Sequence, residues 1–126
     1  MAELNRILLV DDDPDIRTIA HLSLTAVGGF KVEMCSSGTE AIERAAGFAP
    51  DLILLDVMMP GVDGLATLKA LREISQLSET PVVFLTAKVQ PHEVLQLKVA
   101  GALDVLAKPF DPMGLPDSLR RIWATR

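Results

Sequence analysis

Five short apolar runs, separated by helical patterns, constrain the fold of this 126-residue chain more than any other feature. The runs are rich in Leu, Val and Ile, as is typical of buried strands. They are RILLV (6–10), KVEMC (31–35), LILLD (52–56), VVFLT (82–86) and DVLAK (104–108). Strands that alternate with helices form a parallel sheet that is covered on both faces. We therefore predict an α/β, doubly wound (βα)5 fold with a parallel five-stranded sheet and right-handed crossovers.

Residues that start and stop helices lie between these runs. Four helical patterns begin with suitable residues, namely Asp13-Pro14, the capping box of Ser37 and Glu40, Asp63, and Pro91. In the first helix, apolar residues follow helical spacing until Gly28-Gly29, and they are Ile16, Ile19, Ala20, Leu24 and Val27. Gly114 and Pro116 would interrupt the last helix, so we expect regular helix only from about Pro116. Its buried face should carry Leu119, Ile122 and Trp123.

Length and composition indicate one domain, residues 1–126, without a linker or a second hydrophobic block. The net charge of −5 and the lack of a basic stripe argue against direct nucleic-acid binding, because phosphate contacts need Lys and Arg. No apolar run approaches the length that spans a bilayer, and no signal peptide precedes the first run. Cys35 is the single cysteine, which indicates a buried thiol in a reducing compartment. We expect a cytoplasmic protein that binds neither nucleic acid nor membrane.

Polar residues stand where four of the five predicted strands end. Asp11 and Asp12 follow the first strand, Asp56 ends the third, Thr86 ends the fourth and Lys108 ends the fifth. Such strand ends share one edge of the sheet, where ligands of open α/β folds bind. If the first and third strands are neighbours, three carboxylates converge and raise each other's pKa values. A set of oxygen ligands suits Mg²⁺, with Mn²⁺ as a possible substitute. Lys108 can hold an anion, and Asp56 can act as a nucleophile.

These residues lie in four motifs, VDDDP (10–14), LLDVMMPGVDG (54–64), LTA (85–87) and AKPF (107–110). With them, essentially the whole chain resembles the receiver domain of bacterial two-component response regulators, of the chemotaxis type. The resemblance implies a flavodoxin-like three-layer sandwich with strand order 2-1-3-4-5. It also implies that Asp56 accepts a phosphoryl group from a sensor histidine kinase or a histidine phosphotransfer protein, and that the domain signals through a partner protein.

The resemblance assigns a metal ligand set. Asp12 would bind Mg²⁺ directly and Asp11 mostly through water. Asp56 and the backbone carbonyl of Met58 would complete the protein ligands. Each of these assignments is an implication of the family resemblance.

The resemblance also assigns the remaining positions of the site. Thr86 would close on the phosphoryl group, Lys108 would pair with it, and the Lys108-Pro109 bond would be cis. The family usually has an aromatic residue where this chain has Val105, so we expect the switch to depend more on Thr86 and the loop 87–92. We interpret Val105 itself as a packed strand residue.

Two positions beside the expected phosphoryl site predict how long the phosphorylated form lasts. Met58 lies two residues after Asp56 and offers no polar group to orient water. Lys88 lies two residues after Thr86 and can contact an anion. We therefore expect slow self-dephosphorylation.

Three functions remain open at this point. The first is a stand-alone phosphorylatable receiver, since no effector domain follows Arg126. The second is an aspartyl-phosphate phosphatase of the haloacid-dehalogenase type, with its nucleophile at Asp11 and its acid at Asp13. The third is a scaffold that is not phosphorylated. The filled site positions favour the first, in which the chain is a phosphoacceptor and not a conventional enzyme.

Overall fold

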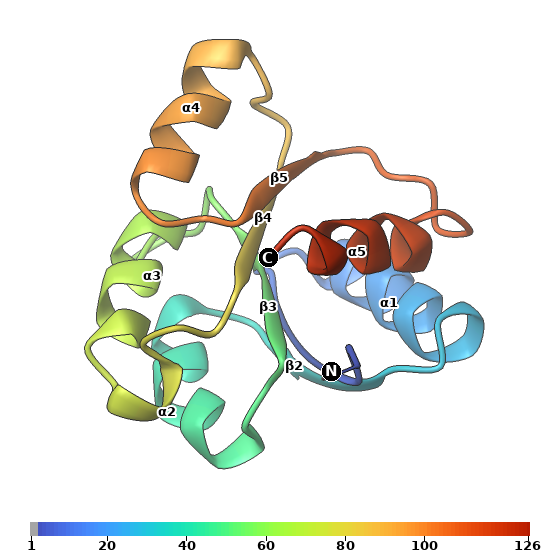
Figure 1. Ribbon diagram of the computed structural model, residues 1–126, viewed down its shortest axis with the longest axis horizontal. Coiled ribbons are helices and arrows are strands. Elements are labelled where there is room, and N and C mark those ends of the chain that lie inside the picture. Colours follow the sequence, from blue (N-terminus) through green and yellow to red (C-terminus); the bar gives the residue numbers. More distant parts are fainter. Residues whose placement is uncertain (1–2) are drawn as a thin grey trace.

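The five apolar runs form a single parallel sheet in the computed structural model, which describes residues 3–126 (Figure 1). The strand order is β2-β1-β3-β4-β5, and every neighbouring pair is parallel. The strands are β1 (Arg6–Val10), β2 (Lys31–Cys35), β3 (Leu52–Asp56), β4 (Val82–Thr86) and β5 (Asp104–Ala107). The predicted flavodoxin-like topology is confirmed, and Lys108 follows the last strand instead of ending it.

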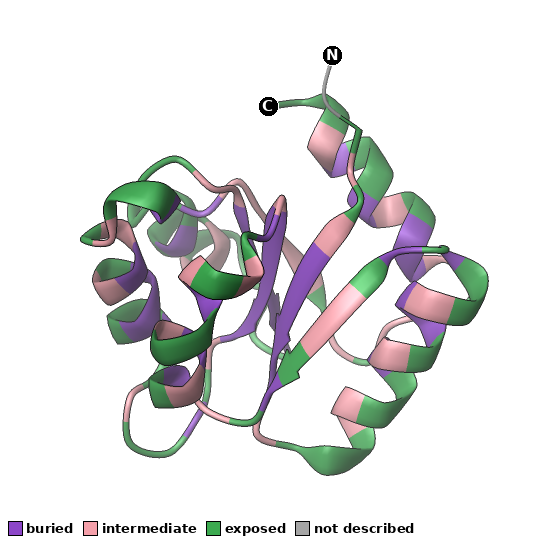
Figure 2. Ribbon diagram, turned by 90° about the horizontal axis from the view of Figure 1, so that it is seen from below, coloured by how far each residue is buried: buried purple, intermediate pink, exposed green. Residues whose placement is uncertain are grey.

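Helices cover both faces of the sheet (Figures 1 and 2). One face packs against α1 (Pro14–Leu22) and α5 (Leu115–Ala124), and the other against α2 (Gly38–Phe48), α3 (Gly64–Arg72) and α4 (Pro91–Val99). Side chains alternate along a strand, so neighbouring residues of β1 belong to different apolar clusters. β3 and β4 are buried at every residue, which explains their continuous apolar sequence.

The predicted helix caps are present, with one difference. The Asp13 carboxylate accepts from the backbone N–H groups of the first turn of α1, and Asp63 does the same for α3. Ser37 Oγ accepts from the N–H of Glu40 at 3.1 Å. The Glu40 carboxylate, however, accepts from the N–H of Ser36 at 3.0 Å, so only half of the predicted capping box forms.

The first helix differs from its prediction, because α1 ends at Leu22 and a π-helical turn, Ser23–Val27, follows it. A π turn is wider than an α turn and shifts the side chains that come after it. The prediction of one regular stripe is therefore wrong at Val27, which is 45% exposed. Ile19 lies before the turn, within α1, and is also 43% exposed. The same turn buries Ser23, whose hydroxyl donates to the carbonyl of Pro112.

The last helix is close to its prediction. α5 begins at Leu115, one residue before Pro116. A proline in the first turn costs no hydrogen bond, because that N–H has no partner within the helix. Leu119 and Ile122 are buried, and Trp123 is partly buried against the same cluster.

The single cysteine is buried, as its sequence context predicts. Cys35 is buried at the end of β2. Burial, with a further contribution from Glu40, raises the pKa of its thiol to about 11, so the thiol is protonated at neutral pH. Among residues 3–126, no helix combines the length and apolar character that crossing a bilayer requires.

Candidate functional site

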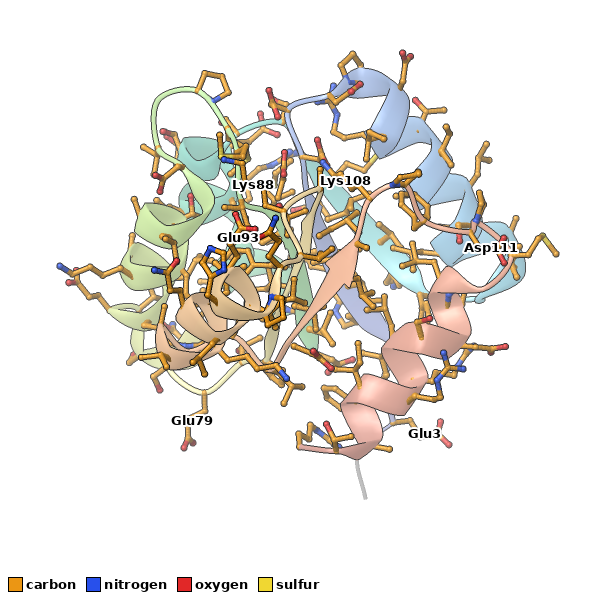
Figure 3. The ribbon with its side chains drawn as sticks, turned by 90° about the horizontal axis from the view of Figure 1, so that it is seen from above. Glu3, Glu79, Lys88, Glu93, Lys108 and Asp111 are labelled. Atoms are coloured by element: carbon orange, nitrogen blue, oxygen red, sulfur yellow. The ribbon has the colours of Figure 1, made fainter. Side chains whose placement is uncertain are left out.

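The fold brings the polar strand ends together at one edge of the sheet. β1 and β4 both pair with β3, and β5 pairs with β4. A hollow of about 300 Å³ opens at this edge. Its lining residues are Asp12, Asp13, Asp56, Met58, Thr86, Ala87, Lys88 and Lys108. Figure 3 shows Lys88 and Lys108 at this end of the molecule, away from Glu79 and Glu3.

A single ammonium group pairs with two buried carboxylates. Lys108 Nζ lies 2.8 Å from Asp11 Oδ2 and 3.2 Å from Asp56 Oδ1. Asp11 is 1% exposed and Asp56 is 5% exposed. Burial alone would lower the pKa of Lys108, but its contacts with the two carboxylates outweigh burial and raise that pKa. The Lys108-Pro109 bond is cis, as the resemblance implied.

The charged form of the Asp56 carboxylate, which ends β3, is destabilised by its surroundings. Burial raises the pKa of Asp56 from 3.8 to about 6, and the negative charge of Asp11 contributes to the rise. Lys108 and the backbone N–H of Met58, which donates to Oδ1 at 3.3 Å, oppose this rise. The single charge of Lys108 therefore neutralises only one of the two buried carboxylates, Asp11 and Asp56. A second cation beside them would be favourable.

The donor groups fit a magnesium ion. Asp11, Asp12 and Asp56 each offer a carboxylate oxygen, and these oxygens lie within 4.8 Å of one another. The Oδ2 atom of Asp11 is buried and has no well-formed hydrogen bond, although it lies close to Lys108. An oxygen-only donor set with few protein ligands matches the preference of Mg²⁺. The metal ligands predicted from the sequence thus include three side chains that the structure brings together.

The other predicted positions surround the hollow, with one exception. Thr86 is buried, and its Oγ1 accepts from the N–H of Lys88 at 3.1 Å. The Thr86 carbonyl accepts from the N–H of Lys108 at 2.9 Å. Met58 is 61% exposed at the rim. Val105 is the exception, because it lies on β5 and packs against the apolar cluster on the face covered by α2, α3 and α4.

Two residues that support the site were not predicted from the sequence. Arg17 donates from Nη1 to the backbone carbonyl of Asp11 at 2.8 Å. Gly64 packs so closely that an added Cβ would lie 2.4 Å from the Asp56 carbonyl oxygen and 2.7 Å from Val57 Cα. Only glycine permits this contact between the start of α3 and the end of β3. The PGVDG segment was the signal for Gly64, whereas no local signal identifies the acceptor of Arg17.

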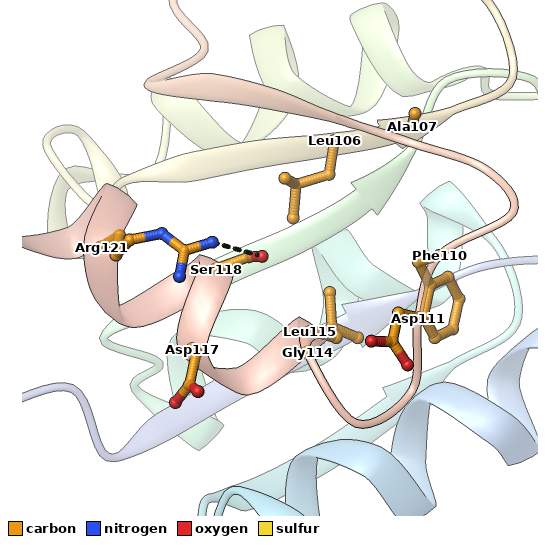
Figure 4. A pocket seen from close by; sticks show the side chains of 9 residues that line it. All are labelled: Leu106, Ala107, Phe110, Asp111, Gly114, Leu115, Asp117, Ser118 and Arg121. Atoms are coloured by element: carbon orange, nitrogen blue, oxygen red, sulfur yellow. Dashed lines mark hydrogen bonds between the residues drawn. The ribbon is translucent and has the colours of Figure 1, made fainter.

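A larger hollow, of about 380 Å³, lies between β5 and α5 (Figure 4). Its lining residues are Leu106, Ala107, Phe110, Asp111, Gly114, Leu115, Asp117, Ser118 and Arg121. Arg121 donates to Ser118 Oγ at 3.1 Å, and the Asp111 carboxylate accepts from the N–H of Met113 at 3.0 Å. Because these polar groups already have partners and no carboxylate cluster forms there among the described residues, we assign the chemistry to the smaller hollow.

Comparison with known families gives one match that spans most of the chain. The family described as the response regulator receiver domain matches residues 7–120. Response regulator Rre1 of Synechocystis sp. is 40% identical over 124 residues, which are 98% of this chain and 54% of that protein. A second Synechocystis protein, the DNA-binding dual master transcriptional regulator RpaA, is 39% identical over 84% of this chain and 44% of its own length. The chain thus spans about half the length of these curated relatives.

Solved structures of full receiver size also resemble this chain. The chemotaxis protein CheY4 of Vibrio cholerae has a TM-score of 0.88 and 35% identity over 95% of this chain and 99% of that chain. A putative response regulator from Chloroflexus aurantiacus has a TM-score of 0.86 and 33% identity over 97% of this chain and 99% of its own. The similarity therefore extends over complete receiver folds.

Proposed function

This chain belongs to the response regulator receiver domain family, and from that premise we propose that it is a phosphorylatable switch of a two-component system or phosphorelay. A sensor histidine kinase or a histidine phosphotransfer protein donates the phosphoryl group, Asp56 accepts it, and a partner protein reads the result. The observation that carries this proposal is the position of Asp56. Its buried carboxylate ends a central strand, faces an open hollow and lies 3.2 Å from Lys108 Nζ.

The contacts of Asp56 support one of its two carboxylate oxygens as the attacking atom. Lys108 and the N–H of Met58 both approach Oδ1, and no group within residues 3–126 forms a hydrogen bond or ion pair with Oδ2. Oδ2 therefore attacks phosphorus, a new O–P bond forms, and the P–N bond to the donor histidine breaks with its electron pair returning to the imidazole. Lys108 balances the charge of the transferred group.

Mg²⁺ supplies further charge neutralisation when it is bound. Asp11, Asp12 and Asp56 would hold it, together with the carbonyl of Met58. In the phosphorylated form the Thr86 hydroxyl, whose oxygen accepts from the N–H of Lys88, donates its proton to a phosphoryl oxygen. Because Val105 cannot move as an aromatic side chain would, we propose that Thr86 and the loop 87–92 carry the conformational change.

The phosphatase alternative has less support. It needs Asp11 as an accessible nucleophile, but Asp11 is buried, and its Oδ1 accepts from the N–H of Asp13 at 3.0 Å. It needs Asp13 as a mobile acid, but the Asp13 carboxylate caps α1. Multiple turnover of p-nitrophenyl phosphate that persists in Asp56→Asn and disappears in Asp11→Asn would favour the phosphatase. A receiver gives no such turnover, and a scaffold binds its partner equally with or without Asp56.

We expect the phosphorylated protein to lose its phosphoryl group slowly, because of Met58 and Lys88 at the hollow. Replacing Met58→Asn and Lys88→Glu together should shorten the lifetime of the phosphorylated form by roughly tenfold, or about 1.4 kcal/mol of barrier. The reason is that Asn can orient an attacking water and that loss of the lysine removes a contact with the anion. The measurement is the decay of phosphoprotein by intact mass after the donor is removed. Met113→Asn with Lys31→Glu, both exposed residues outside the hollow, is the matched control. Equal decay in both double variants and in wild type would contradict the prediction.

The name of one relative includes DNA binding, but this chain covers 44% of that protein. We therefore propose no nucleic-acid or membrane contact for residues 3–126. The acidic net charge of −5 supports output through a protein surface.

A further inference from the structure

Arg17 contacts the backbone of the site and not its carboxylate side chains. It lies on α1, one turn after Asp13, and its Nη1 donates to the carbonyl of Asp11 at 2.8 Å. No carboxylate of residues 3–126 lies within ion-pair distance of its guanidinium. Arg44 is different, because it pairs with acidic side chains. The backbone carbonyl is therefore the group that orients Arg17.

The carbonyl that Arg17 holds belongs to the peptide that joins two of the three clustered carboxylate residues. The peptide before Asp11 is also held, because the N–H of Asp11 donates to the carbonyl of Cys35 at 3.1 Å. The main chain at Asp11 is thus fixed from β2 and from α1. This fixes the direction in which the next residue, Asp12, leaves the sheet.

Asp12 depends on the backbone for its position. Its side chain is partly exposed, and within the described part of the chain no hydrogen bond or ion pair holds its carboxylate. Its oxygen nevertheless lies within 4.8 Å of those of Asp11 and Asp56. With no partner of its own among residues 3–126, the Asp12 carboxylate depends for its direction on the peptide before it, which Arg17 holds.

We propose that Arg17 is a positioning residue for magnesium binding, which it promotes by holding the Asp11–Asp12 peptide so that Asp12 points into the carboxylate cluster. This inference rests on the proposed function, since it concerns the metal that the receiver site would use. Residues that orient metal ligands without touching the metal typically change affinity by about 10–100-fold when they are replaced.

Two possible roles of Arg17, as a nearby positive charge and as a positioning residue, predict opposite changes in Mg²⁺ affinity when it is replaced. As a cation near an acidic cluster, it repels Mg²⁺, so an effect of charge alone would make binding tighter when the arginine is removed. As a positioning residue, it makes binding weaker when it is removed. The sign of the change in the dissociation constant therefore separates the two explanations.

The test is a Mg²⁺ titration of wild type, Arg17→Met and Arg17→Lys, followed through the amide chemical shifts of the site loops. Methionine keeps the apolar stem and removes both the donors and the charge, whereas lysine keeps the charge and one donor group. We expect Arg17→Met to weaken Mg²⁺ binding by ~10-fold or more and Arg17→Lys to lie between it and wild type. Arg44→Met, which removes an equal charge from a helix away from the cluster, should match wild type. Thermal unfolding without metal should change little in Arg17→Met.

Unchanged or tighter Mg²⁺ binding by Arg17→Met, with wild type saturating normally, would overturn the role of Arg17 and leave the proposed function intact. If Arg17→Met does not fold, the Mg²⁺ titration of Arg17→Lys is the deciding measurement. Mg²⁺ binding equal to wild type would overturn the proposal, and several-fold weaker Mg²⁺ binding would support it. A wild-type protein that does not saturate with Mg²⁺ would overturn the metal site itself.

Discussion

Replacing Lys108 with methionine should lower the free energy of unfolding of the metal-free protein by about 3 kcal/mol at pH 8, because two buried carboxylates lose their shared partner. Lys108 Nζ contacts Asp11 at 2.8 Å and Asp56 at 3.2 Å, and both aspartates are at most 5% exposed. The loss should be smaller at pH 5, where a carboxyl group of the pair can take up a proton. Added Mg²⁺ should recover part of the loss, since it replaces the missing positive charge.

Urea unfolding of wild type and Lys108→Met at both pH values is the measurement. Lys98→Met is the matched control, because Lys98 pairs with Asp104 at 3.5 Å with both side chains more than a third exposed. An exposed pair contributes at most about 1 kcal/mol, so this control should change little at either pH. Equal losses in the two variants would contradict the claim that Lys108 compensates a buried charge.

Replacing Asp56 with asparagine should have the opposite effect on the stability of the metal-free protein. The folded state raises the pKa of this carboxyl group from 3.8 to about 6, chiefly through burial and then through the charge of Asp11. A raised pKa means that the folded state binds the proton more tightly than the unfolded state. The stability from Asp56 is therefore complete below about pH 3.8 and is lost as the pH rises through about 6. An asparagine side chain does not titrate, so the variant avoids this loss.

The difference in the free energy of unfolding between Asp56→Asn and wild type should therefore grow in favour of the variant between pH 4 and pH 8. The rise in the pKa of Asp56 sets the size of this difference at up to about 3 kcal/mol. Glu79→Gln, which removes an exposed carboxylate far from the hollow (Figure 3), is the matched control for the loss of one acidic group. A difference for Asp56→Asn that does not depend on pH would contradict the electrostatic account.

The sheet and the site could be predicted because both follow from strand positions. Apolar runs such as 52–56 and 82–86 identify strands that are buried on both faces. The last residue of each parallel strand then lies at a common edge, which brings Asp56 and Thr86 beside the residues that follow β1 and β5. The family resemblance supplied the strand order that made Asp11 and Asp56 neighbours.

The features that sequence patterns missed depend on partners that are distant in the chain or belong to the backbone. The π turn after α1 buries Ser23 against the carbonyl of Pro112, 89 residues away, which no local pattern can indicate. Arg17 resembles an ordinary solvated helix residue until the carbonyl of Asp11 is seen to be its acceptor. Gly64 is required by the backbone of Asp56 and not by a turn of its own.

The central claim is that Asp56 accepts a phosphoryl group, and the most direct test is intact mass after incubation with acetyl phosphate and Mg²⁺. Wild type should gain the mass of one phosphoryl group, EDTA should prevent the gain, and Asp56→Asn should gain nothing. Asp111→Asn, which changes an exposed aspartate outside the carboxylate cluster, should behave as wild type. No adduct on folded wild type, or the same adduct on Asp56→Asn, would contradict the claim.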